Sequence, residues 1–436
     1  MTHPWRPSKP RSSSTTRFSQ PPTSCTVAVV MGNSTSPETL RAETRAASGV
    51  EKGSRPLQGH MPVLDGVRGL AVLMVLVFHF VGDIMEPTGR AESAIAKLVA
   101  YGATGVDLFF ILSGFLITGI LFEASSKRHY FRNFYMRRVL RIFPLYYGVL
   151  VCVFFVAPAL PFCRGAALDF LIQRQAWAWL YAVNVYIAKT GTWSLTYIEH
   201  FWSLCVEEHF YLVWPFIVWL LARHPRRLMW VSLFLAVGAM VARLVGFAAG
   251  LSWTTTYVFT PFRLDGLALG GFLAILARQP RGLDAIARNV GRVGLAAGAL
   301  FALSLVWVKV IHWGLSFVYP IRSSLIIVLL ATLLMGALTS LENSVASRFF
   351  RSRFMLRAGT YSYGLYVYHH FIYYYMKTHR TWVVVSRWLG SNMAAVLAQA
   401  AVGMLASAAI AYASYELFEK PFLSLKRYFE ARPVER

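Results

Sequence analysis

Apolar runs long enough to cross a bilayer recur from about residue 62 onward, and no other feature restricts the fold as strongly. A membrane-spanning helix needs roughly 17 to 25 mainly apolar residues. The chain of 436 residues is 56% hydrophobic and only 14% charged, whereas a soluble protein carries roughly 25% charged residues. The sequence therefore predicts an all-α protein, a polytopic bundle of transmembrane helices.

Short basic loops between the apolar runs predict how the helices are oriented. Basic residues next to spans mark the cytoplasmic face of a membrane. If about ten runs cross, all the basic segments fall on one side and both termini are cytoplasmic. We therefore expect a multi-pass protein of the inner (cytoplasmic) membrane, embedded in the lipid bilayer. The basic segments are 127–141, 223–227, 278–292, 348–357 and 426–436. The predicted spans lie near 63–83, 102–122, 139–160, 206–222, 228–249, 262–278, 293–312, 321–341, 360–378 and 393–417.

One further apolar segment, residues 168–188, is ambiguous because Arg174 lies between two glutamines in it. Counting it as a span would place the basic loop 127–141 on the opposite side from the other basic loops, against the positive-inside rule. We therefore expect this segment to lie at the outer interface or to form a re-entrant element.

The two ends of the chain differ from the apolar part. Residues 1–60 are rich in Ser, Thr, Pro and Arg and lack the apolar material for a core, so they are expected to form a disordered extension. Met31 and Met61 are alternative starts. Residues 61–425 form the predicted membrane domain, and residues 426–436 a basic cytoplasmic tail.

Charge and cysteine content exclude some classes of partner. The net charge is +23, but its basic residues are dispersed over short loops, so no nucleic-acid partner is expected. The four cysteines show neither metal-ligand nor CxxC spacing. No metal site is predicted, and a disulfide between Cys163 and Cys205 is an alternative to two free thiols.

The first span, in LDGVRGLAVLMVLVFHF (64–80), contains two ionisable residues that share one face. His79 lies eleven positions after Arg68, which is about three helical turns, or roughly 16 Å along the axis. An ionisable residue inside a membrane is a functional candidate, and histidine can act as a general base near neutral pH. The alternative for His79 is a structural hydrogen bond to a neighbouring helix.

The second and third spans add polar candidates. Asp107 lies near the outer end of the second span, where a carboxylate needs a partner. Ser113 lies in its middle, where small residues allow helices to approach closely. Arg137, Arg138 and Arg141 cluster at the inner end of the third span. Positive-inside anchoring explains them, but the last two share a face and form a fork suited to phosphate.

Later spans carry further candidates. Glu207 and Glu208 are adjacent, and adjacent helical residues point about 100° apart, so we expect at most one of them to face His79 and the other to support the structure. For His369 and a neighbouring histidine, helix packing and function explain the sequence equally well. Trp202 precedes the glutamates, and Arg263 and Asp265 lie at the outer end of another span.

Six segments, in this order, resemble the acyltransferase-3 family of integral-membrane O-acyltransferases, which includes O-antigen and peptidoglycan O-acetylases. They are LDGVRGLAV…FH, GVDLFFILSGFLIT, FYMRRVLRIFPLYY, WSLCVEEHFYLVWP, SYGLYVYHH and YELFEKP. The resemblance covers about residues 62–425. The family's arginine-ten-residues-histidine pattern falls on Arg68 and His79, and its RxxR pattern on Arg138 and Arg141. Its FFxxSG motif falls on residues 109–114. Two departures are His209, where glutamine is usual, and His370, where an aromatic residue is common.

The resemblance implies a reaction in which an acyl group, acetyl above all, passes from cytoplasmic acyl-CoA to a hydroxyl of a carbohydrate or other glycosylated acceptor on the outer side. It implies that Arg68, Arg137, Arg138 and Arg141 contact the polyanionic acyl-CoA. His79 is the implied base, with an acyl-histidine intermediate as a variant, and Asp83 or Asp107 is a candidate to orient its imidazole. The catalytic candidates are His79, Asp107, Glu207 and Glu208. The candidate substrate contacts are Trp202, Ser113, Arg263, Asp265 and His369.

Two other classes of protein use ionisable residues inside a helix bundle. A transporter places them along a substrate pathway and is often built from internal repeats, and no repeat is visible in this sequence. A non-catalytic scaffold or sensor needs them only for structure, so that His79 would tolerate Asn or Gln.

Overall fold

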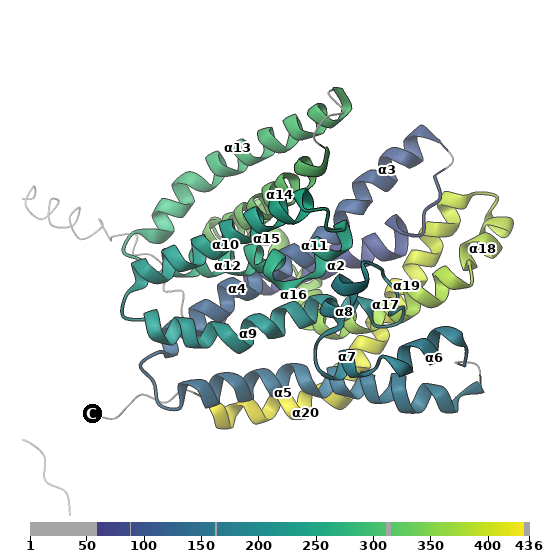
Figure 1. Cartoon of the computed structure of the whole chain (residues 1–436), viewed down its shortest axis with the longest axis horizontal. Coiled ribbons are helices and arrows are strands. Elements are labelled where there is room, and N and C mark those ends of the chain that lie inside the picture. The colour runs from purple at the N-terminus through teal and green to yellow at the C-terminus, as the bar shows by residue number, and fades with distance from the viewer. Residues whose placement is uncertain (1–58, 88, 162–163, 311–314, 431–436) are drawn as a thin grey trace, which may run out of the picture. The chain divides into compact units, whose positions relative to one another are not determined.

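The computed structural model describes residues 59–87, 89–161, 164–310 and 315–430. These residues form helices and no strand (Figure 1), which confirms the predicted all-α class. Apart from its last two residues, the expected extension 1–60 lies outside the described residues. So do Cys163 and the end of the basic tail, whereas Cys205 is a buried free thiol.

Long helices alternate with short connecting helices. The long helices are α2 (Pro62–Val77), α4 (Gly105–Ala124), α5 (Tyr130–Val151), α9 (Trp202–Leu221), α10 (Pro225–Ala248), α12 (Thr260–Ala277), α13 (Gly282–Val310), α14 (Leu315–Thr339), α17 (Ser362–Thr378) and α19 (Asn392–Ser414). The short helices are α3 (Arg90–Ala100), α6 (Ala166–Gln173), α7 (Ala176–Trp179), α8 (Val183–Thr190), α11 (Trp253–Val258), α15 (Val345–Phe350), α16 (Arg353–Thr360), α18 (Thr381–Leu389) and α20 (Lys420–Ser424). A π-helical turn, η1 (Phe78–Gly82), continues α2, and a 3₁₀ helix, η8 (Leu425–Phe429), follows α20.

Within the described residues, 9 helices are long and apolar enough to cross a membrane, and they account for every predicted span except 360–378. That segment forms α17, which has 17 residues. At 1.5 Å per residue α17 is about 26 Å long, close to the ~30 Å thickness of a hydrocarbon core. The protein is therefore a polytopic, multi-pass membrane protein.

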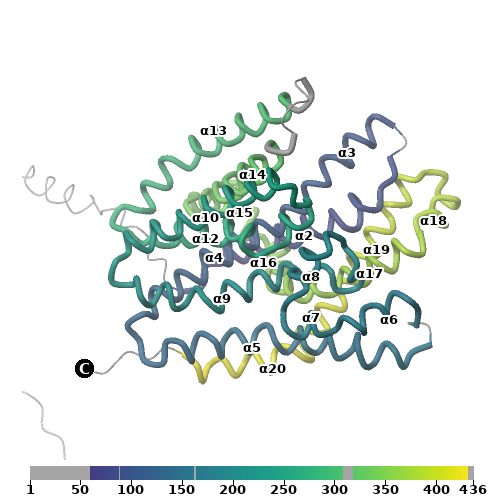
Figure 2. Tube along the Cα trace, viewed as in Figure 1, coloured from purple at the N-terminus to yellow at the C-terminus, as the bar shows by residue number. Residues whose placement is uncertain are grey.

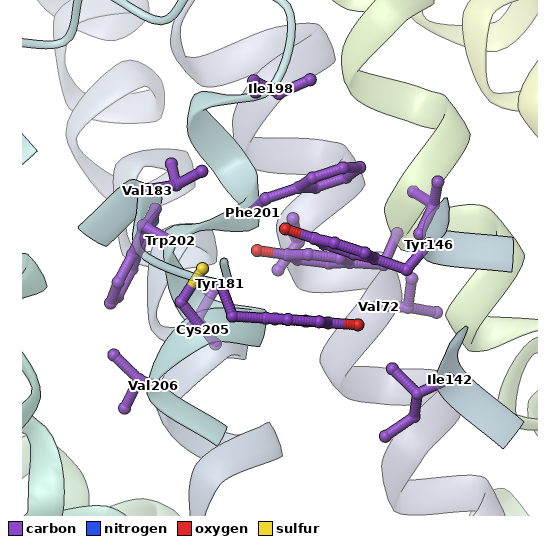
Figure 3. Packing of buried hydrophobic residues seen from close by; sticks show 14 of the residues in the cluster. Val72, Ile142, Tyr146, Tyr181, Val183, Ile198, Phe201, Trp202, Cys205 and Val206 are labelled. Carbon is purple, nitrogen blue, oxygen red and sulfur yellow. The ribbon is translucent and has the colours of Figure 1, made fainter. Parts of the chain in front are cut away.

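The ambiguous segment 168–188 does not form a spanning helix. It folds into the short helices α6, α7 and α8, interrupted at Tyr181, which has a positive φ of 53°. The ring of Tyr181 stacks on Tyr146 of α5 with a centroid distance of 4.1 Å, and Phe201 packs on the same stack (Figure 3). The hydroxyl of Tyr146 donates to the carbonyl oxygen of Ala178 at 2.8 Å. These contacts hold the segment against α5, and they confirm that it is not an eleventh span.

Close backbone contact joins α4 to α12 in the middle of the bundle. A Cβ atom on Gly114 would lie 1.9 Å from the carbonyl oxygen of Leu267, and one on Gly270 would lie 2.1 Å from that of Ile111. No side chain fits either place, so the helices meet through glycines, as small residues permit in membranes. This contact fixes the position of α4, whose other residues face α2 and α9.

The C-terminal segment returns to α5. Helix α20 contacts α5 and lies along it (Figures 1 and 2). Beyond it, the guanidinium of Arg132 lies 5.9 Å from the ring of Phe429, and the amide of Asn133 donates to the carbonyl of Glu430 at 3.5 Å. The first residues of the predicted tail are thus packed against the N-terminal end of α5.

Candidate active site

A charged pocket lies among α2, α4, α5, α9 and α17. We call it the arginine pocket, because Arg68, Arg138 and Arg141 line it together with Glu207 and Glu208. Its other polar lining residues are Ser113, Ser203, Tyr211, Ser362, Tyr363 and Tyr366.

The three arginines of the pocket differ in their partners. Arg68 forms an ion pair with Asp65 of its own helix. Arg138 lies over the ring of Tyr211, at 5.1 Å from the centroid. Among the described residues, neither Arg138 nor Arg141 forms an ion pair. Unpaired guanidinium groups beside an open volume are suited to an anionic ligand. Arg137 is exposed and does not line the pocket.

Lys426 belongs to the same positive region, although sequence analysis placed it only in a basic tail. It lies in η8, which packs on α5, and it experiences the charges of Arg68, Arg137, Arg138 and Arg141. Its side chain is half-buried and forms no ion pair within the described part of the chain. Only the return of the C-terminal segment to α5 reveals this proximity, and the sequence carries no signal for it.

The two glutamates of α9 lie differently from our expectation. Both line the arginine pocket, whereas His79 does not. The hydroxyl of Ser113 donates to Oε1 of Glu207 at 2.7 Å, and the hydroxyl of Tyr211 donates to its Oε2 at 3.2 Å. Oε1 of Glu208 is buried without a hydrogen bond. Both glutamates therefore lie beside the arginines, instead of one facing His79 and the other supporting the structure.

His79 lies in a second, separate group of side chains, which we call the histidine cluster: His79, His200, His369 and His370. The ring centroid of His79 is 5.0 Å from that of His369 and 5.4 Å from that of His370. His200 stacks on His370 at 4.3 Å. His369 is 0% exposed, and His79 is partly exposed. His200 was not predicted from the sequence, although an isolated histidine at the start of an apolar run is a signal for a functional residue.

The carboxylates near the histidine cluster have other partners. Asp83 accepts hydrogen bonds from the hydroxyl of Tyr373 and, at 2.6 Å, from the ammonium of Lys377. Glu199 lies 3.7 Å from Nε2 of His370. Neither Asp83 nor Asp107 forms a hydrogen bond with His79, so the expectation that one of them orients the imidazole is not met.

Asp107 and the two candidate residues of α12 form buried ion pairs. Arg263 pairs with Asp107 and joins α12 to α4, while Asp265 pairs with Arg243 of α10. Trp202 is 4% exposed and lies 5.7 Å from the guanidinium of Arg263. None of these side chains lines the arginine pocket. Sequence analysis missed Arg243, although an arginine inside an apolar run was a signal for it.

Helix α2 connects the two groups. Arg68 enters the arginine pocket, and His79 stands roughly 16 Å further along the axis in the histidine cluster. Tyr366 lies at the boundary, because it lines the pocket while its hydroxyl donates to the carbonyl of His200 at 2.8 Å. Within the described residues, no group of three or more His, Cys, Asp or Glu side chains could hold a metal ion.

Comparisons with known proteins identify the family of this chain. Residues 61–416 match the family model of an acyltransferase domain. The chain is 28% identical over 334 residues to the peptidoglycan O-acetyltransferase OatA of Listeria monocytogenes, covering 74% of this chain and 50% of that protein. It is 26% identical to the O-acetyltransferase OatA of Staphylococcus aureus, over 73% of this chain and 52% of that protein.

A shorter match reaches higher identity. Over 163 residues the chain is 34% identical to the putative peptidoglycan O-acetyltransferase YrhL of Bacillus subtilis, covering 36% of this chain and 23% of that protein. The chain thus spans about half the length of the two OatA relatives and less of YrhL. No solved structure gives a significant match. Because the family model covers most of the sequence, the protein belongs to the acyltransferase-3 family of membrane proteins.

Proposed function

We propose that this protein is an O-acyltransferase of the inner membrane that moves an acyl group, acetyl above all, from acyl-CoA to a hydroxyl of an envelope carbohydrate. One observation carries the proposal: α2 brings Arg68 into a pocket whose Arg138 and Arg141 form no ion pair within the described residues, and its continuation η1 brings His79 into a cluster where only Nδ1 of His79 forms a hydrogen bond among those residues. A polyanionic donor and a general base would then act from the two ends of one helix.

The arginine pocket supports a phosphate-bearing donor. Coenzyme A carries a diphosphate and a ribose phosphate, which guanidinium groups bind with charge-assisted hydrogen bonds. Arg138 and Arg141 form no ion pair within the described chain, although Glu207 and Glu208 line the same pocket. Lys426 adds an amine close to these two arginines, and a bound phosphate would favour its protonated form. We assign these residues, with Arg68, to the donor's phosphates, and the basic loops support a cytoplasmic position for this end of α2.

The histidine cluster supports the transfer step. Nε2 of His79 removes the proton from the acceptor hydroxyl, and the oxygen forms a bond to the thioester carbonyl carbon. The carbon–sulfur bond then breaks, and the leaving thiolate takes up the proton held by His79. An acyl-histidine intermediate is a variant of the same chemistry. The acceptor approaches from the outer side, because His79 stands at the far end of α2 from Arg68.

The relatives suggest the class of acceptor. Two of them are named as peptidoglycan O-acetyltransferases, one of these as putative. A glycan of the cell envelope is therefore the acceptor that we propose for this chain. Its hydroxyl groups are the nucleophiles that an O-acyl transfer requires.

Radiolabelled acetyl-CoA tests the proposal. Membranes that contain the wild type, His79→Ala or His379→Ala at matched expression would be incubated with the label and with envelope glycans. His379 is exposed and its side chain bonds to the carbonyl of Tyr375, one turn earlier on its own helix, which makes it a matched control. We expect label on glycan hydroxyls with the wild type and the control only. Equal label with His79→Ala, or solute movement without acyl transfer, would contradict the proposal.

A further inference from the structure

We propose that His369 is a positioning residue that holds His79 in the tautomer with its proton on Nδ1, so that Nε2 is the base. The inference rests on the proposed function. It gives His369 a role in place of the substrate contact expected from the sequence. The contacts of both imidazoles lead to this assignment.

A backbone hydrogen bond determines which ring nitrogen of His79 carries the proton. Its Nδ1 lies 3.0 Å from the carbonyl oxygen of Val75, one helical turn earlier. A carbonyl oxygen only accepts hydrogen bonds, so Nδ1 must carry the proton and donate it. A neutral imidazole has one proton, which leaves Nε2 with its lone pair. His79 lies in the π-helical turn η1, a local widening of the helix that is frequent at functional sites.

A backbone hydrogen bond also determines which ring nitrogen of His369 carries the proton. Its Nδ1 lies 3.0 Å from the carbonyl oxygen of Leu365, so this nitrogen also donates. Nε2 of His369 therefore carries a lone pair, and it lies 3.3 Å from Nδ1 of His79. The Nδ1 proton of His79 is shared between two acceptors, the carbonyl of Val75 and Nε2 of His369.

The opposite tautomer of His79 is disfavoured by this pair of acceptors. With its proton on Nε2, the bare Nδ1 would face the lone pairs of Val75 and His369, and both hydrogen bonds would be lost. His369 cannot turn away, because it is fully buried between the rings of Phe80 and Tyr366, with centroids at 6.4 and 5.6 Å. Buried polar atoms without partners are costly. His369 thus stabilises the tautomer of His79 that carries its proton on Nδ1.

His369 also takes the place that a carboxylate has in a catalytic triad. When Nε2 of His79 accepts a proton, Nδ1–H stays bonded to the same two acceptors. Asp83, the nearest acid along the same helix, is engaged by Tyr373 and Lys377. A neutral nitrogen, instead of an anion, therefore orients this base and shares its transient charge.

Two amide substitutions separate this role from a structural one. In His369→Gln the side-chain oxygen reaches the position of Nε2 and can accept from His79, but the bond to Leu365 is lost. In His369→Asn the amide keeps the bond to Leu365 and cannot reach His79. We expect Gln to restore most of the turnover, and Asn to lower kcat about 10- to 30-fold with little change in KM for acyl-CoA.

His370→Asn is the matched control, because the ring of His370 lies 5.4 Å from the ring of His79 and forms no hydrogen bond with it. We expect it to lower kcat less than His369→Asn does. A more active Asn variant than Gln variant, or equal activity of the two, would overturn the assignment. An inactive wild type would instead contradict the proposed function, so the two failures are distinguishable.

A measurement on the wild type covers the case in which an amide variant does not fold. Nitrogen-15 NMR of histidine-labelled protein distinguishes the two neutral tautomers, and comparison with His79→Gln identifies the signals of His79. We expect a protonated Nδ1 and a bare Nε2 at neutral pH. A protonated Nε2 on neutral His79 would overturn the proposal.

Discussion

The arginine pocket and the histidine cluster lie along one helix but are built in opposite ways. The pocket is open and charged, and two of its arginines have no ion-pair partner in the described chain. The rings of the cluster are packed on one another, and its two central histidines bond to backbone carbonyls. Cations without partners suit a ligand that brings its own negative charge. A closely packed imidazole suits a group that must hold one tautomer.

The largest expected effect is that of His79→Ala, which should lower kcat and leave KM for acyl-CoA nearly unchanged. His79→Ala removes the base, so kcat should fall by about 10²- to 10⁴-fold. KM for acyl-CoA should change little, because His79 does not line the arginine pocket. Steady-state acetyl transfer in membranes measures both values. A variant that kept its kcat would remove the histidine cluster from the reaction.

A paired cation should behave differently from an unpaired one. Arg263→Met leaves Asp107 buried without its partner, which should cost about 3–5 kcal/mol of stability. Thermal unfolding of the detergent-solubilised protein should show a clearly lower Tm. Arg137→Met, at an exposed arginine, is the control and should leave Tm nearly unchanged. Equal Tm values for the two variants would show that the buried pair does not hold α4 and α12 together.

The unpaired arginines should affect donor binding. Removing a charge-assisted hydrogen bond in Arg138→Gln or Arg141→Gln should raise KM for acetyl-CoA roughly 10- to 100-fold. Acetyl-pantetheine lacks the phosphates, so its KM should stay the same in both variants. An equal rise in KM for acetyl-CoA and acetyl-pantetheine would show that the arginines do not bind the phosphates.

The smallest effect concerns the C-terminal segment. Lys426→Met should raise KM for acetyl-CoA about two- to fivefold, as expected for a half-exposed charge. Lys420 is the matched control, because it lies on the same segment and pairs with Glu416 at 2.7 Å. Lys420→Met should leave KM unchanged. Identical values for the two variants would place Lys426 outside the donor site.

The sequence predicted features that depend on a single helix. The length of the apolar runs indicated the spans, and the spacing of Arg68 and His79 put both on one face of α2. The spacing of Arg138 and Arg141 likewise put them on one face. Each of these inferences needs only the helical repeat, which is a property of consecutive residues.

Features that depend on two helices could not be predicted in the same way. The pairing of Asp107 with Arg263, 156 residues later, requires the rotation of α12 against α4. The contact of His369 with His79 spans 290 residues. Facing positions on separate helices are set by packing such as the glycine contact of Gly114, and a hydropathy pattern carries no such information.

Donor binding measured apart from turnover tests the central claim most directly. Purified wild type, His79→Ala and Arg138→Gln would be titrated with a non-transferable acyl-CoA analogue, and acetyl transfer would be measured on the same preparations. We expect His79→Ala to bind the analogue with wild-type affinity but to transfer acetyl about 10²- to 10⁴-fold more slowly, while Arg138→Gln binds it weakly. Weak binding by His79→Ala, together with wild-type binding by Arg138→Gln, would contradict the division of roles between the two regions.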